Sequence, residues 1–145
     1  MSKLAISTLL AASAVIGSTV AVAQANTGVR LTATLDGASE IPGPGDPDGT
    51  GTATVRINPG QNQLCYSITV SGIAPATAAH IHEAPAGTAG PVIQGLKAPT
   101  TGTSQGCVSI TRELAKEIVR NPSDYYVNVH NAEFRAGAVR GQLGR

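Results

Sequence analysis

Apolar and polar residues alternate with a period of two along most of this chain, and this pattern restricts the fold more than any other feature. Successive side chains of a β-strand point to opposite faces, so the alternation predicts strands with one buried face. Turns rich in Gly and Pro separate the alternating stretches, which cover residues 29–35, 52–57, 64–70, 78–83, 92–96, 106–110, 125–130 and 138–143. The pattern predicts an all-β fold: a small antiparallel Greek-key β-sandwich of about eight short strands.

One segment has a helical period instead. Between residues 111 and 120, Leu114 is followed by Ile118 at i+4, and Ala115 by Val119. Thr111 suits the N-cap position, and the dipeptide 121–122, Asn-Pro, ends the pattern. We therefore expect one short helix, laid across an edge of the sandwich.

The first 25 residues differ from the rest of the chain. Lys3 precedes an apolar stretch over residues 4–22, which ends in two overlapping small-x-small patterns at 21–23 and 23–25. This arrangement predicts a secretory signal peptide over residues 1–23, with cleavage as late as 25; the alternative is an uncleaved membrane anchor. No later stretch is apolar enough to span a bilayer. We expect a secreted or periplasmic protein without a membrane span after cleavage.

The charge pattern excludes several classes of protein. Ten basic and nine acidic residues give a net charge of +1, and no run of like charge occurs, which argues against nucleic-acid binding. A hydrophobic content of 41% with almost no net charge argues against disorder. The chain also lacks the nucleophile elbow, the phosphate-binding loop and the zinc-protease helix motif.

Two cysteines, Cys65 and Cys107, lie in the expected mature domain. In an oxidising compartment a lone pair is most simply one disulfide, and metal thiolates are the alternative. A disulfide would close a loop of about 42 residues and stabilise the fold by about 4 kcal/mol in the chain-entropy view.

The chain has three histidines, at His80, His82 and His130. Residues two apart in a strand share a face, so His80 and His82 point the same way, opposite Ile81. His130 has the matching parity in its own stretch, opposite Val129. If the apolar residues face the core and the two strands are neighbours, three imidazoles meet in one outer patch.

Such a patch suits a metal ion, because imidazole favours copper, zinc, nickel and iron. The three histidines are the predicted ligands, with copper ahead of zinc. The oxygen candidates for a further ligand or neighbour are Glu40, in a long loop, and Glu83, which points away from His82 along an ideal strand; water is a third choice. The alternative is that the histidines are polar residues on a solvated face.

A series of motifs in a fixed order resembles the CHRD domain, a family named from chordin and found in exported bacterial proteins. The resemblance covers residues 30–143 and rests on the segments 35–42, 65–66, 79–83, 90–93, 125–130 and 137–143. It departs from the family where Glu83-Ala84-Pro85 replaces a usual Gly, and again over 134–137. The role of chordin as an extracellular antagonist implies protein binding, but fold alone does not give function.

A more distant likeness is to Cu/Zn superoxide dismutase, also a Greek-key sandwich. By motif, His80, His82 and His130 match its three copper ligands. No fourth histidine exists to bridge to zinc, so an enzyme of the Cu/Zn type is excluded, whereas a copper-only relative is not. Arg140, on the last expected strand, has the parity to be a neighbour of the patch. This likeness implies at most weak copper-dependent redox activity.

These observations together predict an exported CHRD-type domain that binds a metal ion, copper first, through three histidines. The alternative is an extracellular structural or protein-interaction module without a metal, whose protein partner the residues do not identify.

Overall fold

The computed structural model describes residues 28–145, and the predicted signal peptide lies outside that range. Eight strands, the helix α2 and a short 3-10 turn make up the described chain. Their order is β1 (Val29–Asp36), β2 (Thr50–Asn58), β3 (Gln63–Ser71), β4 (Ala76–Glu83), β5 (Val92–Leu96), β6 (Thr103–Ser109), α2 (Arg112–Arg120), η1 (Pro122–Asp124), β7 (Tyr125–Asn131) and β8 (Val139–Gln142). The predicted all-β class and the predicted number of strands are confirmed.

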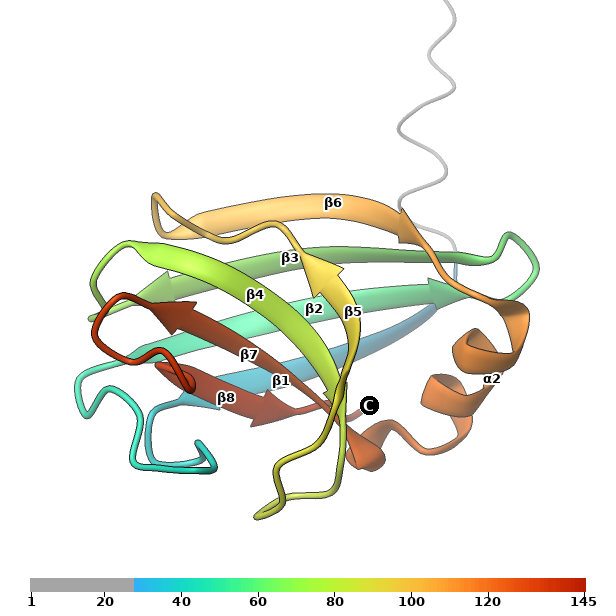
Figure 1. Ribbon diagram of the computed structural model, residues 1–145. Coiled ribbons are helices and arrows are strands. Elements are labelled where there is room, and N and C mark those ends of the chain that lie inside the picture. Colours follow the sequence, from blue (N-terminus) through green and yellow to red (C-terminus); the bar gives the residue numbers. More distant parts are fainter. Residues whose placement is uncertain (1–27) are drawn as a thin grey trace, which may run out of the picture.

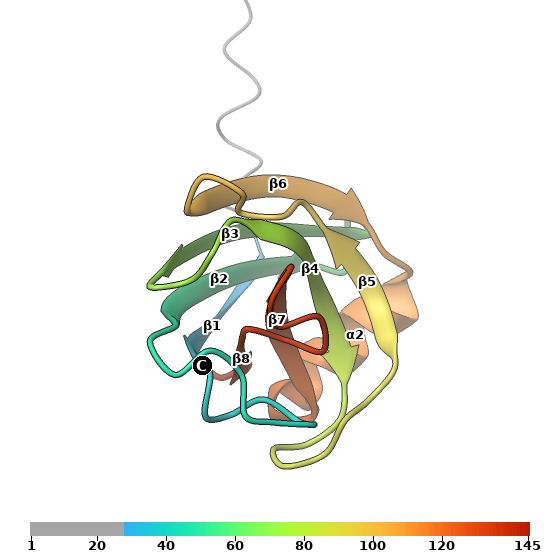
Figure 2. The same ribbon diagram turned by 60° about the vertical axis from the view of Figure 1, so that its left-hand side comes forward.

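The strands form one antiparallel sheet in the order β5-β4-β7-β8-β1-β2-β3-β6. The sheet curls on itself into a nearly closed barrel, with β5 and β6 as its two edges (Figures 1 and 2). The β7–β8 hairpin lies between β4 and β1, so two strands far apart in sequence, β4 and β7, become neighbours. This is the adjacency that a shared histidine patch requires.

Alternate residues of the strands fill the barrel, as the period of two predicts. Large side chains such as Leu31, Val55, Ile68 and Ile81 are buried to 1% exposure or less. The loops at 37–49 and 132–138 lie at the barrel end opposite α2 (Figure 1).

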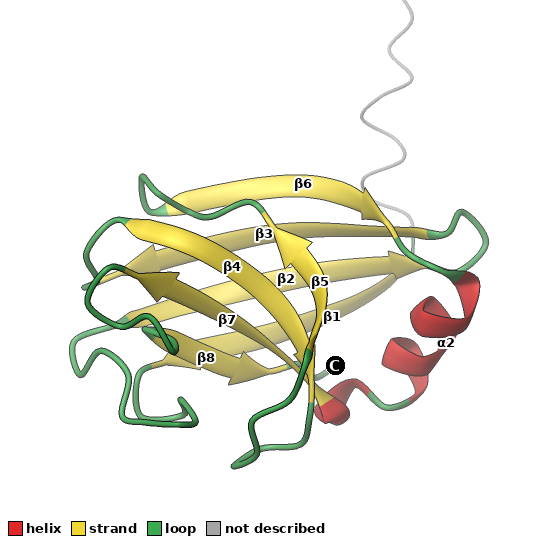
Figure 3. Ribbon diagram, in the orientation of Figure 1, coloured by secondary structure: helices red, strands yellow, loops and turns green. Residues whose placement is uncertain are grey.

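Helix α2 lies across one end of the barrel, where Figure 3 shows it in red. Its predicted N-cap is confirmed, because the Thr111 hydroxyl accepts a hydrogen bond of 3.2 Å from the backbone N–H of Leu114. Ala115 and Ile118 are fully buried in the core cluster. Among residues 28–145, no helix has the length and apolar character to cross a membrane.

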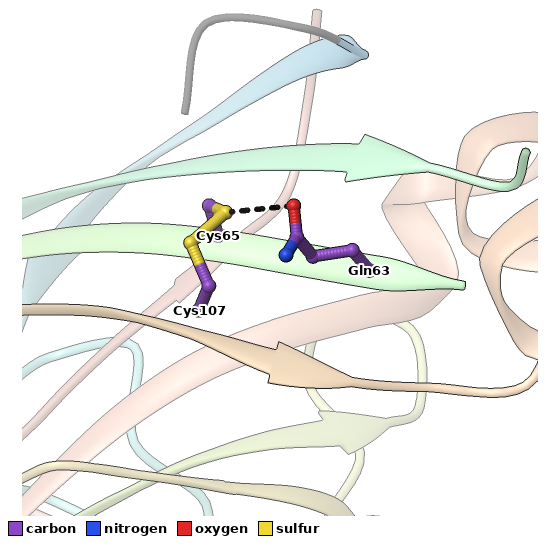
Figure 4. Close-up of a disulfide and its surroundings, with 3 residues drawn as sticks. All are labelled: Gln63, Cys65 and Cys107. Atoms are coloured by element: carbon purple, nitrogen blue, oxygen red, sulfur yellow. Dashed lines mark hydrogen bonds between the residues drawn. A yellow bond between two sulfur atoms is a disulfide. The ribbon is translucent and has the colours of Figure 1, made fainter. Parts of the chain in front are cut away.

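The predicted disulfide joins Cys65 on β3 to Cys107 on β6 (Figure 4). The two residues are direct partners across the antiparallel pair, with Cα atoms 3.9 Å apart. The bridge therefore fastens edge strand β6 to the sheet. It excludes the thiolate alternative, because the chain has no other cysteine.

Replacing Cys65 and Cys107 together by serine should lower the free energy of unfolding by about 4 kcal/mol, because the unfolded chain regains the entropy of a loop of about 42 residues. Urea denaturation followed by far-ultraviolet circular dichroism measures the change. Ser109→Ala, an exposed position on the same strand, is the matched control. Equal midpoints for the double variant and the control would contradict the loop-entropy argument.

Candidate metal centre

The three histidines come together on the outer side of the β4–β7 pair. In the register of this pair, His80 lies opposite Asn128. His130 lies opposite Ala78, which is two residues before His80 on β4. The intervening Ile81 and Val129 are fully buried inside the barrel, as their parity predicts. One ligand nitrogen from each ring can be chosen so that all three lie within 4.8 Å of one another.

The closest approach is between His80 Nδ1 and His130 Nε2, which are 3.0 Å apart. The His80 ring centroid lies 4.9 Å from that of His130 and 5.6 Å from that of His82. Metal–nitrogen bonds of about 2.0–2.1 Å place two tetrahedral ligand nitrogens about 3.4 Å apart. The His80–His130 pair therefore lies close to the spacing that one ion needs, whereas the cluster of three as a whole spans up to 4.8 Å.

His82 lies on the outer face of its strand, as its parity predicts, but it is covered there and only 8% of the residue is exposed. The segment 84–91 covers it, with the carbonyl oxygen of Gly90 2.9 Å from Nδ1. The Tyr126 ring stacks on it at 4.7 Å and an interplanar angle of 8°. Because His80 and His130 are half-buried, the site is buried on one side and open on the other.

Backbone carbonyls fix the protonation pattern of two of the rings. His82 Nδ1 lies 2.9 Å from the carbonyl oxygen of Gly90, and His130 Nδ1 lies 2.9 Å from that of Arg135. A carbonyl oxygen only accepts hydrogen bonds, so each Nδ1 carries the hydrogen and each neutral ring has a bare lone pair on Nε2. Outer hydrogen bonds of this kind orient histidines that bind metals.

Asn128 lies directly behind these two lone pairs. Its side-chain oxygen Oδ1 is 3.0 Å from His82 Nε2 and 3.1 Å from His130 Nε2, and the residue is 2% exposed. In a neutral ring that donates from Nδ1, the lone pair on Nε2 faces this oxygen, and in a protonated ring Nε2 donates to it. Sequence reasoning missed Asn128, although it has the same parity as His130.

Burial favours the uncharged form of His80 and His130, the two half-buried rings of the cluster. Desolvation lowers the pKa of His80, and the neighbouring rings of His130 and His82 lower it further. Desolvation also lowers the pKa of His130, against the opposing effect of the Arg135 carbonyl. These two rings are therefore neutral at neutral pH, which is the form that binds a metal ion.

Glu40 lies behind Asn128, outside the histidine cluster. It comes from the loop between β1 and β2 and is 1% exposed. Burial raises the pKa of its carboxyl to about 7, although Arg140 and a hydrogen bond with the Asn128 side chain work in the opposite direction. Glu40 thus contacts the site through Asn128.

The other two candidate neighbours lie on different sides of the site. Glu83 is exposed and lies beside helix α2, together with Lys116. Arg140 is only 1% exposed and stacks on Tyr126, with its guanidinium carbon 3.4 Å from the ring centroid. Within residues 28–145, the only cluster of three or more His, Cys, Asp or Glu groups able to share one ion consists of the three histidines.

In comparisons with known proteins, the CHRD domain matches residues 31–143. This range includes all eight strands apart from the start of β1, and all three histidines. No curated protein matches the chain. The resemblance seen in the sequence motifs is confirmed.

The free energy of unfolding of Glu40→Gln should increase relative to that of the parent protein as the pH rises. Between pH 4.5, the ordinary pKa, and about 7, folded Glu40 keeps a proton that the unfolded chain has lost. The protonated Glu40 carboxyl therefore stabilises the folded state fully below pH 4.5, and this stabilisation is lost as the pH rises through the folded pKa of about 7. Urea denaturation at intervals from acid to slightly alkaline pH measures the difference between variant and parent. Exposed Glu83→Gln is the control, and a Glu40→Gln difference that does not vary with pH would contradict the assignment.

Proposed function

This chain belongs to the CHRD domain family, and we propose that it binds a metal ion, copper in preference to zinc, through His80, His82 and His130. The observation that carries the proposal is the direction of the ring nitrogens. Two Nδ1 atoms are committed to backbone carbonyls, and one nitrogen from each of the three rings lies within 4.8 Å of the other two. Histidines that were merely polar residues on a solvated face would not need convergent, preset lone pairs.

The choice of copper follows from the donor set. Nitrogen-rich sites bind divalent ions in the Irving–Williams order, in which Cu²⁺ exceeds both Ni²⁺ and Zn²⁺. Soft sulfur ligands contribute nothing here, because both cysteines are bridged and the single methionine is Met1. A site of three imidazoles is the result.

Three protein ligands leave a coordination position for water or a small exogenous ligand. His82 is covered, so a further ligand would approach from the open side, where a cavity of about 420 Å³ adjoins His80, His130 and Arg135. Glu40 and Glu83 complete no ligand set in this arrangement. The protein would therefore hold or transfer the ion, and any copper-dependent redox turnover would be slow without a bridging histidine and zinc.

We also propose that the domain works outside the cytoplasm. The cross-strand disulfide suits an oxidising compartment. The predicted signal peptide over residues 1–23 points to the same compartment. The competing role, a structural or protein-interaction module without a metal, is distinguished by the metal content of protein purified from the periplasm or the medium.

Calorimetric titration of the metal-free protein should show one Cu²⁺ site of micromolar affinity or tighter, weaker binding of Ni²⁺ and Zn²⁺, and a steep loss of affinity below about pH 6, because protons compete for the imidazole nitrogens. Replacing any one histidine by alanine should weaken binding strongly, since two imidazoles leave the ion mostly to water. Exposed Glu83→Gln is the control. Tight Cu²⁺ binding that survives replacement of all three histidines would end the proposal.

Asn128→Ala should strengthen Cu²⁺ binding by about tenfold, because the ion no longer displaces an amide that is hydrogen-bonded to two ring nitrogens. Titration of the variant beside the parent, with circular dichroism to verify the fold, measures this. The outcome separates two roles for the residue. Weaker binding would mean that the amide oxygen is itself a ligand or that it holds the rings in place for the ion.

A further inference from the structure

Arg140 is a buried cation without a carboxylate partner. It is 1% exposed, yet within residues 28–145 no carboxylate oxygen lies within the 4.0 Å of an ion pair with it. Its Nη2 donates to the carbonyl oxygen of Pro85 at 3.1 Å and to Gln142 Oε1 at 3.0 Å. Its Nη1 is shielded from solvent and has no hydrogen-bond partner in the described chain. Buried charges are normally paired, so this guanidinium lacks an acceptor.

Glu40 does not fill this role. It interacts electrostatically with Arg140, but its own Oε1 is also without a hydrogen-bond partner in the described part of the chain. The two groups therefore lie near each other without forming a direct contact.

A cavity of about 270 Å³ adjoins the guanidinium. Its walls are small or apolar residues of two loops, among them Ala38, Ser39, Ile41 and Ala86, and Arg140 and Gln142 line it as well. Arg140 is the only charged residue that lines it. The charged side chain and the space thus occur together, and a ligand reaches the shielded Nη1 only by displacing the loop atoms that cover it.

The guanidinium is also held rigidly in place. Tyr126 stacks on it at 3.4 Å, while Gln142 is itself fixed by donating from Nε2 to the carbonyl oxygens of Ala84 and Ser123. A preset planar cation loses little freedom when an anion binds.

We propose that this cavity, defined by Arg140, Gln142 and the loops 38–41 and 86–87, binds a small carboxylate. The two hydrogens of Nη2 are taken by Pro85 and Gln142, so a carboxylate oxygen would accept a charge-assisted hydrogen bond from the unpaired Nη1. The apolar walls suit a short aliphatic tail, and the volume suits a ligand of a few heavy atoms. The site does not depend on the proposed metal, because its ligand contacts none of the three histidines.

Titration of the metal-free protein with propionate, followed by two-dimensional ¹H–¹⁵N NMR, tests the proposal. Saturable shifts should appear at the amides of residues 38–41 and 86–87, with a millimolar dissociation constant. Propionamide, which has nearly the same shape but no charge, should cause no such shifts. Arg140→Gln should weaken propionate binding about tenfold or more, since a charge-assisted hydrogen bond is lost. Arg30→Gln, at an exposed arginine of β1, should leave binding unchanged.

A second variant keeps the test decisive if Arg140→Gln does not fold. Ala86→Leu adds volume at an exposed wall position while Arg140 stays intact, and it should abolish the propionate shifts without altering the rest of the spectrum. Equal binding of propionate and propionamide, unsaturable shifts, or full propionate binding by Ala86→Leu would overturn the proposal and leave water as the partner of Nη1. Because no metal is present, none of these outcomes bears on copper binding.

Discussion

The pairing of β4 with β7 is the constraint on which both the core and the candidate site depend. In its register, Ile81 lies opposite Val127 and both are fully buried, while His80 lies opposite Asn128 on the other face. A slip of one residue would move every apolar side chain of the strand to the outside. The burial of Ile81 and Val127 therefore sets the register, and the register in turn brings the histidines together. Core packing thus determines which histidines come together.

Part of this arrangement is readable from the sequence, because parity along a strand is a local property. Alternation identifies the strands and the face of each histidine, and the cap at Thr111 marks the start of the helix. Local patterns do not encode which strands become neighbours, and the adjacency of β4 and β7 arises only when the hairpin of β7 and β8 enters the sheet. Local patterns do not encode the paths of loops either. The segment that covers His82 and the contact of Asn128 with two rings therefore could not be predicted from the sequence. A strand side chain that points away from the barrel can still be buried when a loop crosses it.

Those loops make a second, polar core on the outside of the barrel. The guanidinium of Arg140, the ring of Tyr126 and the ring of His82 form one continuous stack. Asn128 connects the same His82 to Glu40 on the other side. Burial of so many polar groups is unfavourable unless each is hydrogen-bonded or stacked, and most of these are. In this layer of the described chain, Arg140 Nη1 and Glu40 Oε1 have no hydrogen-bond partner, and they mark where the layer is incomplete.

The same layer sets how readily a metal ion enters. Two of the three rings are already oriented by carbonyl oxygens, so little ring freedom remains to be lost on binding. Against this, the 3.0 Å between His80 Nδ1 and His130 Nε2 is shorter than the roughly 3.4 Å between tetrahedral ligands, so these two rings must separate slightly and His80 Nδ1 must lose the hydrogen that it donates to His130. The amide of Asn128 must also release both Nε2 atoms. The affinity for a metal ion therefore depends on two opposing effects. Ring orientation that is fixed in advance favours binding, and the hydrogen bonds of the metal-free rings oppose it. Asn128 is the residue whose replacement changes the second effect.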